Sequence, residues 1–154
     1  MNHTTKFAVL AYVGFTTYIT VEVCFRGYSY PLMGVCGSIL LLLLDYFIER
    51  IPWSVDLFTQ GLIGSCLITC MELIIGITLQ ACHFPPMWDY SSEWMNFRGV
   101  ICPLFSFLWI AVSCLGIMLA DSINYYLLCC GSRPHYTLFR KISFIFPERK
   151  ILYQ

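Results

Sequence analysis

Four long runs of apolar residues dominate the chain, and short polar stretches separate them. The runs cover roughly residues 7–25, 32–48, 57–80 and 104–120. A helix needs about 20 mostly apolar residues to cross a bilayer, with a range of about 17–25. Apolar and polar positions do not alternate within the runs, so strands of a membrane β-barrel are not indicated. The pattern predicts an all-α polytopic membrane bundle of about four transmembrane helices.

The connection at 83–103, HFPPMWDYSSEWMNFRGVICP, differs from the other connections in length and content. It carries two tryptophans, and Trp and Tyr are typical of the membrane–water interface. Pro85 and Pro86 end any helix that precedes them. We therefore expect an ordered extracytoplasmic loop that packs on the ends of the first and third helices.

Composition agrees with a membrane protein. Charged residues make up 12% of the chain, against about 25% in soluble domains. The formal net charge is 0, which gives no argument for nucleic acid as a partner. We expect a transmembrane helical domain over 1–130 and a basic, aromatic cytoplasmic tail over 131–154. Such a tail favours contact with anionic membrane lipids.

The distribution of Lys and Arg predicts the orientation in the cell membrane. With four spans, two basic residues fall on one side, Arg26 and Arg98, and seven fall on the other: Lys6, Arg50, Arg133, Arg140, Lys141, Arg149 and Lys150. Cytoplasmic connections carry the excess of Lys and Arg. Both termini are therefore predicted to be cytoplasmic, and the segment INYYLLCC (123–130) is too short to cross alone but can extend the fourth helix.

The third run places a carboxylate inside the predicted membrane. Glu72 shares a helical row with Gly64, Ile68 and Gly76, and small residues at this spacing let helices approach closely. Glu72 should thus point into the bundle. An intramembrane carboxylate costs at least about 2.5–3.5 kcal/mol on insertion scales and marks a candidate functional site.

Several charged and aromatic residues gather on the predicted outer side. They form our candidate substrate or ion site: Glu22, Glu72, Trp88, Asp89 and Arg98. In one interpretation they are structural, with Glu22 paired to Arg26 and Glu72 neutralised by Arg98. In the other they line a polar cavity that holds a cation, a proton or a substrate amine. Asp45 and Asp121 lie near the opposite helix ends, where we expect solvation by water and headgroups.

The cysteines indicate no metal site, because no His or C-x-x-C spacing accompanies them. Most lie in the apolar runs, where Cys behaves as a small hydrophobic residue. Cys82 and Cys102 flank the loop and are either disulfide-bonded or free thiols. No catalytic residue, metal or other cofactor is indicated.

Several segments resemble a known family. GLIGSCLITCMELIIGITL, WDYS, NFRGVICPLFSFLW and RPHYTLF are similar to bacterial integral membrane proteins of the family called putative ABC-transporter type IV, over roughly residues 26–139. The order WDYS, then N-F-x-G-x-I-C, then Phe-Ser-x-x-Trp is the most specific part. Motif positions are occupied by Glu72, Trp88, Asp89, Tyr90, Ser91, Asn96, Gly99, Cys102, Ser106 and Trp109.

The resemblance implies a small permease or transporter component. The chain has no G-x-x-x-x-G-K-[ST] phosphate loop, so an ATP-driven transporter would need a separate ATPase subunit. Four helices are few for a substrate path, so the permease interpretation implies a homo-oligomer. Two alternatives stay open: a non-transporting membrane scaffold or accessory protein, and a membrane enzyme that uses carboxylates in the outer leaflet.

Overall fold

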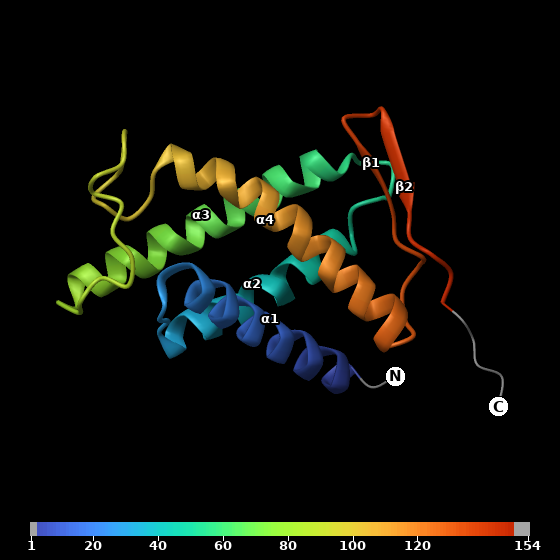
Figure 1. The fold of residues 1–154 in the computed structure, drawn as a ribbon, viewed down its shortest axis with the longest axis horizontal. Coiled ribbons are helices and arrows are strands. Elements are labelled where there is room, and N and C mark those ends of the chain that lie inside the picture. Colours follow the sequence, from blue (N-terminus) through green and yellow to red (C-terminus); the bar gives the residue numbers. More distant parts are fainter. Residues whose placement is uncertain (1–2, 150–154) are drawn as a thin grey trace.

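The computed structural model describes residues 3–149 and contains the predicted four long helices. They are α1 (His3–Arg26), α2 (Pro31–Ile48), α3 (Leu57–Ala81) and α4 (Pro103–Ser122). All four are long and apolar enough to cross a membrane. Figure 1 shows that successive helices run in opposite directions, with the 82–102 loop at one end of the molecule. The all-α membrane fold is confirmed.

The chain sets the helix boundaries with local signals. Pro31 and Pro103 stand in the first turns of α2 and α4, where the missing proline N–H leaves no intrahelical bond unmade. The Asp56 side chain caps α3 by accepting a hydrogen bond from the Phe58 N–H at 2.9 Å. Gly27 follows the last residue of α1 and has a φ of +81°. This left-handed conformation ends the helix, and residues with a side chain rarely adopt it.

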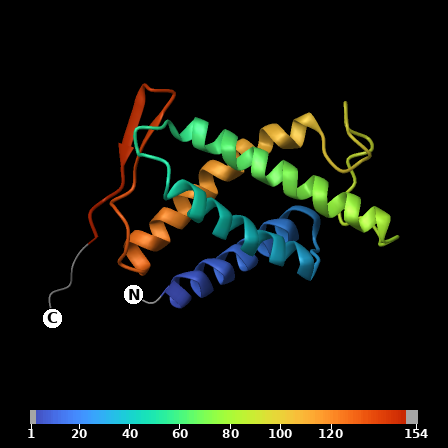
Figure 2. The same cartoon turned by 180° about the vertical axis from the view of Figure 1, so that it is seen from behind.

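The helices form two antiparallel pairs, α1 with α2 and α3 with α4, and α2 also packs on α4 (Figures 1 and 2). Small residues bring the helices together, as the sequence predicts. A Cβ added to Gly14 of α1 would lie 2.5 Å from the Gly37 carbonyl oxygen of α2. A Cβ added to Gly64 of α3 would lie 2.6 Å from the Ser113 side chain of α4. Close backbone approach of this kind holds helices together in lipid, where the hydrophobic effect contributes little between them.

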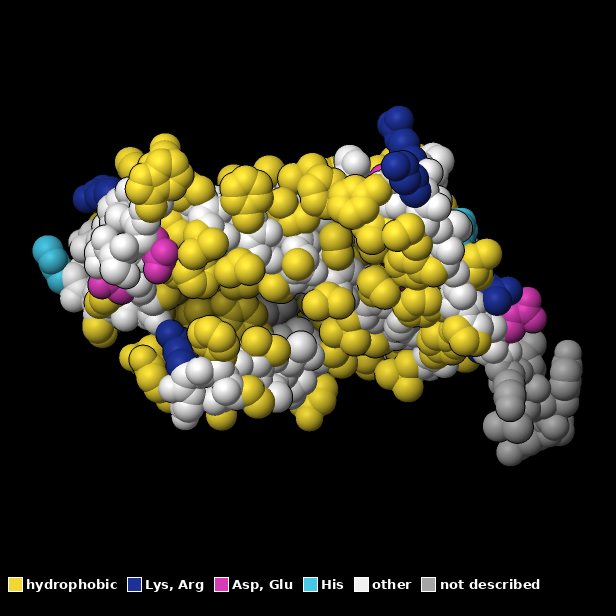
Figure 3. Space-filling model, turned by 45° about the horizontal axis from the view of Figure 1, so that its top comes forward, with side chains coloured by type: hydrophobic (Ala, Val, Ile, Leu, Met, Phe, Trp, Pro, Cys, Tyr) yellow, Lys and Arg dark blue, Asp and Glu magenta, His cyan; other side chains and the backbone are white. Residues whose placement is uncertain are grey.

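The surface has the polarity of a membrane protein. Large apolar side chains point outward along the helices, such as Phe25 (89% exposed) and Phe107 (71% exposed). Figure 3 shows hydrophobic side chains over the middle of the visible face and charged side chains toward its two ends. In water such a surface would promote association. Facing lipid, it is the expected exterior.

The fourth helix continues as a short π-helical segment, η1 (Ile123–Leu127). Together α4 and η1 form an apolar stretch of 25 residues. The prediction that INYYLLCC extends the fourth helix is therefore confirmed as far as Leu127, although the helical pitch changes there.

A β-hairpin follows, which the sequence analysis missed. Strands β1 (His135–Leu138) and β2 (Ile142–Ile145) pair antiparallel, with His135 opposite Ile145. Tyr136 is 2% exposed and packs in the core with Leu44 and Ile117. The first part of the predicted tail is thus folded onto the helices. Residues 150–154, including Lys150, lie outside the described part of the chain.

Candidate functional site

The loop between α3 and α4 is held by hydrogen bonds from its own motif residues. The Ser91 N–H donates to the Asp89 carboxylate at 2.8 Å. The Asn96 amide donates to the Ser91 carbonyl at 3.0 Å and accepts from the Gly99 N–H at 3.0 Å. The Tyr90 N–H donates to the Gly99 carbonyl at 2.8 Å. The motif positions Asp89, Ser91, Asn96 and Gly99 therefore shape the loop.

Glycine is required at position 99 for two reasons. Its φ is +69°, in the region that L side chains rarely adopt. A Cβ at this position would also lie 2.9 Å from the Asp89 carboxylate oxygen. The loop can close around the Asp89 side chain only because Gly99 has no side chain.

Tyr90 connects the loop to the buried carboxylate of α3. Its hydroxyl donates to Glu72 Oε1 at 2.8 Å, and the Trp109 indole N–H of α4 donates to Glu72 Oε2 at 2.9 Å. Glu72 is 8% exposed, so it points into the bundle as the sequence predicts. The Tyr90 ring stacks on Phe105, with 4.3 Å between ring centroids. Burial, with the Glu72 carboxylate nearby, raises the pKa of the Tyr90 hydroxyl, which keeps its proton available for this bond.

The proposed ion pair between Glu72 and Arg98 is wrong. Among the described residues, Arg98 is part of no ion pair with Glu72, whose two oxygens accept from Tyr90 and Trp109 instead. The Arg98 backbone has a φ of 54°, and its carbonyl accepts from the Gln80 side chain at 3.0 Å. The Arg98 side chain is exposed at the loop surface.

Glu22 belongs to a separate network at the end of α1. Its carboxylate pairs with the Arg26 guanidinium at 2.8 Å, the i,i+4 pair expected from the sequence, and accepts from the Ser29 hydroxyl at 2.5 Å. Arg26 also donates to the Met87 carbonyl of the loop at 3.0 Å. The two acids, Glu22 and Glu72, both lie at the loop end of the bundle, but each has its own partners.

A cavity of about 220 Å³ opens between α3 and the loop, and we call it the loop cavity. Its lining includes Gly76, Gln80, Trp88, Asp89, Arg98 and Val100. Trp88 is fixed there because its indole N–H donates to the Val100 carbonyl at 2.8 Å. Hydrogen bonds from Ser91, chiefly from its backbone N–H, hold the pKa of the exposed Asp89 carboxyl below its usual range. The lining thus contains an acidic, a basic and an aromatic residue, Asp89, Arg98 and Trp88, while Glu72 lies outside it.

The remaining motif residues serve packing. The Ser106 hydroxyl lies 3.1 Å from that of Thr69, and the Ser106 carbonyl accepts from the Ser65 hydroxyl at 2.6 Å. Cys102 is a buried free thiol and Cys82 an exposed one. Within residues 3–149, no group of three His, Cys, Asp or Glu side chains is arranged to hold a metal ion.

Fold and site together define the class: a helical membrane protein with four membrane-length helices and an ordered polar loop at one end. The model of the family described as Putative ABC-transporter type IV matches residues 7–145, and the chain belongs to this family. The match extends the resemblance of the loop motifs to most of the chain. Comparison with the curated proteins and with the solved structures gave no match.

Proposed function

We propose that the chain is the membrane component of a transport complex, and that its loop cavity is an outward-facing site for a small polar solute. The observation that supports the proposal is that Asp89, held by the Ser91 N–H, and Arg98 both belong to the lining of one cavity. A carboxylate and a guanidinium, with the Trp88 indole in the same lining, can bind a solute that has both a cationic and an anionic group. Glu72 is a positioning residue in this proposal, because it holds the loop through Tyr90.

The other parts of a transporter would come from outside this chain. A separate ATPase subunit would supply the energy, since the sequence has no phosphate-binding loop of its own. Four helices do not enclose a path, so we propose that copies of the chain assemble around one. Both termini and the tail would be cytoplasmic, where seven of the nine basic residues then lie.

The orientation has a direct test in two native cysteines. Cys82 is exposed beside the loop, and Cys129 is exposed two residues beyond the end of η1; Figure 1 shows the end of α4 opposite the loop. A membrane-impermeant maleimide added to intact cells should label Cys82 and leave Cys129 unlabelled until the cells are opened, and Cys82→Ser supplies the control. Labelling of Cys129 first would reverse the proposed orientation.

The solute site is tested by metabolite profiling of cells that lack the chain and of cells complemented with variants. We expect one class of polar metabolite to change in the deletion strain. Wild type and Glu148→Gln, which removes an exposed carboxylate at the other end, should restore it, whereas Asp89→Asn and Arg98→Gln should not. Full restoration by both loop variants, at equal amounts of protein in the membrane, would contradict the solute site.

A second candidate function is that of a non-transporting accessory protein that acts through the hairpin. Phe139, Ile142 and Ile145 are large exposed apolar residues there, next to Arg140 and Lys141, a combination suited to headgroups or a protein partner. Deleting the tail would not test this, because Tyr136 belongs to the core. Arg140→Gln with Lys141→Gln keeps the hairpin, and loss of complementation by this variant alone would favour the accessory role.

A further inference from the structure

A second cavity, of about 260 Å³, lies at the end of the molecule opposite the loop. We call it the terminal cavity. Its walls come from the end of α2, the 49–56 connection, the start of α3, the end of α4 with η1, and the segment before β1. The sequence analysis assigned no site to this end, where Asp45 and Asp121 were expected to be solvated.

Gln60 belongs to the lining of this cavity and carries a buried acceptor without a partner among the described residues. It is 3% exposed, and its side-chain oxygen has no hydrogen-bond partner among the described residues. Its amide nitrogen donates to the Val55 carbonyl at 2.9 Å. Flipping the amide would bring its oxygen against the Val55 carbonyl oxygen, so the side-chain oxygen is the atom left without a partner. A buried acceptor left without a donor costs about 1–3 kcal/mol, so a donor bound at this oxygen would stabilise the folded chain.

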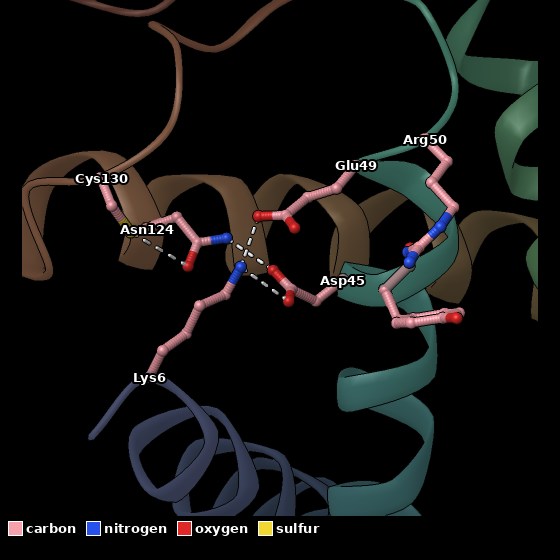
Figure 4. A network of polar contacts seen from close by, with 7 residues as sticks. Lys6, Asp45, Glu49, Arg50, Asn124 and Cys130 are labelled. Carbon is pink, nitrogen blue, oxygen red and sulfur yellow. Dashed lines mark hydrogen bonds and ion pairs between the residues drawn. The ribbon is translucent and has the colours of Figure 1, made fainter. Parts of the chain in front are cut away.

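Acidic side chains surround the same space. Asp121 accepts from the Tyr136 hydroxyl through Oδ2 at 2.7 Å, and its other oxygen has no hydrogen-bond donor among the described residues. Figure 4 shows Lys6 reaching both Asp45, at 2.9 Å, and Glu49. The Lys6 ammonium therefore pairs with the carboxylates of Asp45 and Glu49, while Asp121 is bonded to Tyr136. The expectation that Asp45 and Asp121 are merely solvated is wrong, because each has a side-chain partner.

The side-chain amide of Asn124, which also lines the cavity, is already bonded. Asn124 lies in η1 and is 3% exposed. Its amide nitrogen donates to Asp45 Oδ1 at 2.6 Å, and its oxygen lies 3.8 Å from the Cys130 thiol (Figure 4). No Lys, Arg or His of the described chain lines the cavity. The charged residues of the lining, Glu49 and Asp121, are thus both acidic, and its neutral donors are limited to groups such as the Trp53 indole and the Ser132 hydroxyl.

We propose that the terminal cavity binds a small organic ammonium ion. Its N–H donors would satisfy Gln60 Oε1 and the free oxygen of Asp121, and its carbon skeleton would lie against Ile48, Ile51 and Trp53. A bare metal ion fits poorly, because the described residues supply no set of three ligands. The volume is just below the range of about 300–1,000 Å³ typical of ligand pockets, so the ligand is a compact amine. The site is independent of the proposed solute site at the other end.

Calorimetric titration of the full chain in lipid nanodiscs tests the proposal with 2-phenylethylammonium as probe. The neutral 2-phenylethanol has the same shape and partitions into lipid, so it controls for membrane uptake. We expect saturable one-to-one binding of the ammonium and binding of the alcohol that is at least tenfold weaker. A hydrogen bond to a charged group corresponds to roughly a ten- to hundredfold change in affinity. Asp121→Asn should therefore weaken the binding of 2-phenylethylammonium by that factor.

Two further variants complete the design. Glu148→Gln removes an exposed carboxylate from the same end outside the cavity and should bind like wild type. Gln60→Lys places a tethered ammonium in the cavity and should abolish binding without lowering the melting temperature. Equal binding of alcohol and ammonium by wild type, or wild-type affinity in folded Asp121→Asn or Gln60→Lys, would overturn the proposal. The comparison of the two probes uses only the wild-type chain. It therefore tests the proposal even if a variant fails to fold.

Discussion

Replacing Glu72 with Gln distinguishes a hydrogen-bonded carboxylate from a buried ion pair. Trp109 can only donate, so the Gln oxygen must face it, and the Gln NH₂ then faces the Tyr90 hydroxyl, which can accept. Both contacts survive with one reversed. We therefore expect Glu72→Gln to change the free energy of unfolding by no more than about 1 kcal/mol.

A buried ion pair would respond differently. Removing one partner of such a pair costs about 3–5 kcal/mol, because the other charge stays buried alone. For a domain of this size about 1 kcal/mol corresponds to about 2–4 °C in melting temperature. The structure thus predicts a shift under about 4 °C for Glu72→Gln, and the ion-pair interpretation predicts at least about 6 °C.

Removing a donor should cost more than changing the acceptor. Tyr90→Phe keeps the stack on Phe105 but leaves Glu72 Oε1 without its donor, at about 1–3 kcal/mol. Melting temperature and near-ultraviolet circular dichroism in detergent would measure both variants. A loss above about 3 kcal/mol in Glu72→Gln that Arg98→Met restores would refute the hydrogen-bonded arrangement.

Three further predictions concern other parts of the bundle. Gly14→Ala brings a Cβ to 2.5 Å from the Gly37 carbonyl oxygen and should cost about 1–3 kcal/mol in detergent unfolding. Ser113→Ala removes a buried hydroxyl with no partner among the described residues and should raise stability by about 1 kcal/mol; a loss instead would mean that the hydroxyl is bonded. Burial and the Asp121 carboxylate raise the pKa of the Tyr136 hydroxyl, so its stabilising contribution is complete below about pH 10 and is lost as the pH rises further. Tyr136→Phe should therefore lose less stability above pH 10 than wild type.

Hydrophobicity and spacing predicted the helices and the direction of Glu72, because both depend on residues close in sequence. The partners of Glu72 were missed because side-chain reach across a loop is not encoded in spacing. The signal was nevertheless present, since Tyr90 and Trp109 are motif positions that carry a donor. A buried carboxylate favours a cationic partner, so charge alone predicts Arg98 as the partner of Glu72 in place of these neutral donors.

The hairpin and the terminal cavity escaped the sequence analysis for a related reason. HYTL and ISFI are two short β-prone segments on either side of FRK, a hairpin signal, but the basic and aromatic composition of the tail took precedence. Lys6 lies near the start of α1 and Asp45 near the end of α2, so antiparallel packing brings them together. That contact follows from pairing the first two helices, which the pattern of apolar runs does not specify.

The two cavities differ in how they depend on the packing of the helix pairs. The loop cavity is built from α3 and its own loop, so its shape is set within one pair. The terminal cavity takes Ile48 from α2, Glu49 from the connection after it, and Gln60 and Asp121 from α3 and α4, so both pairs must be in place to form it. Among the described residues, the hydrogen bond from Asn124 to Asp45 joins the pairs at that end. Because lipid gives apolar helices little drive to associate, a ligand in the terminal cavity would add to the few polar contacts that hold the pairs together.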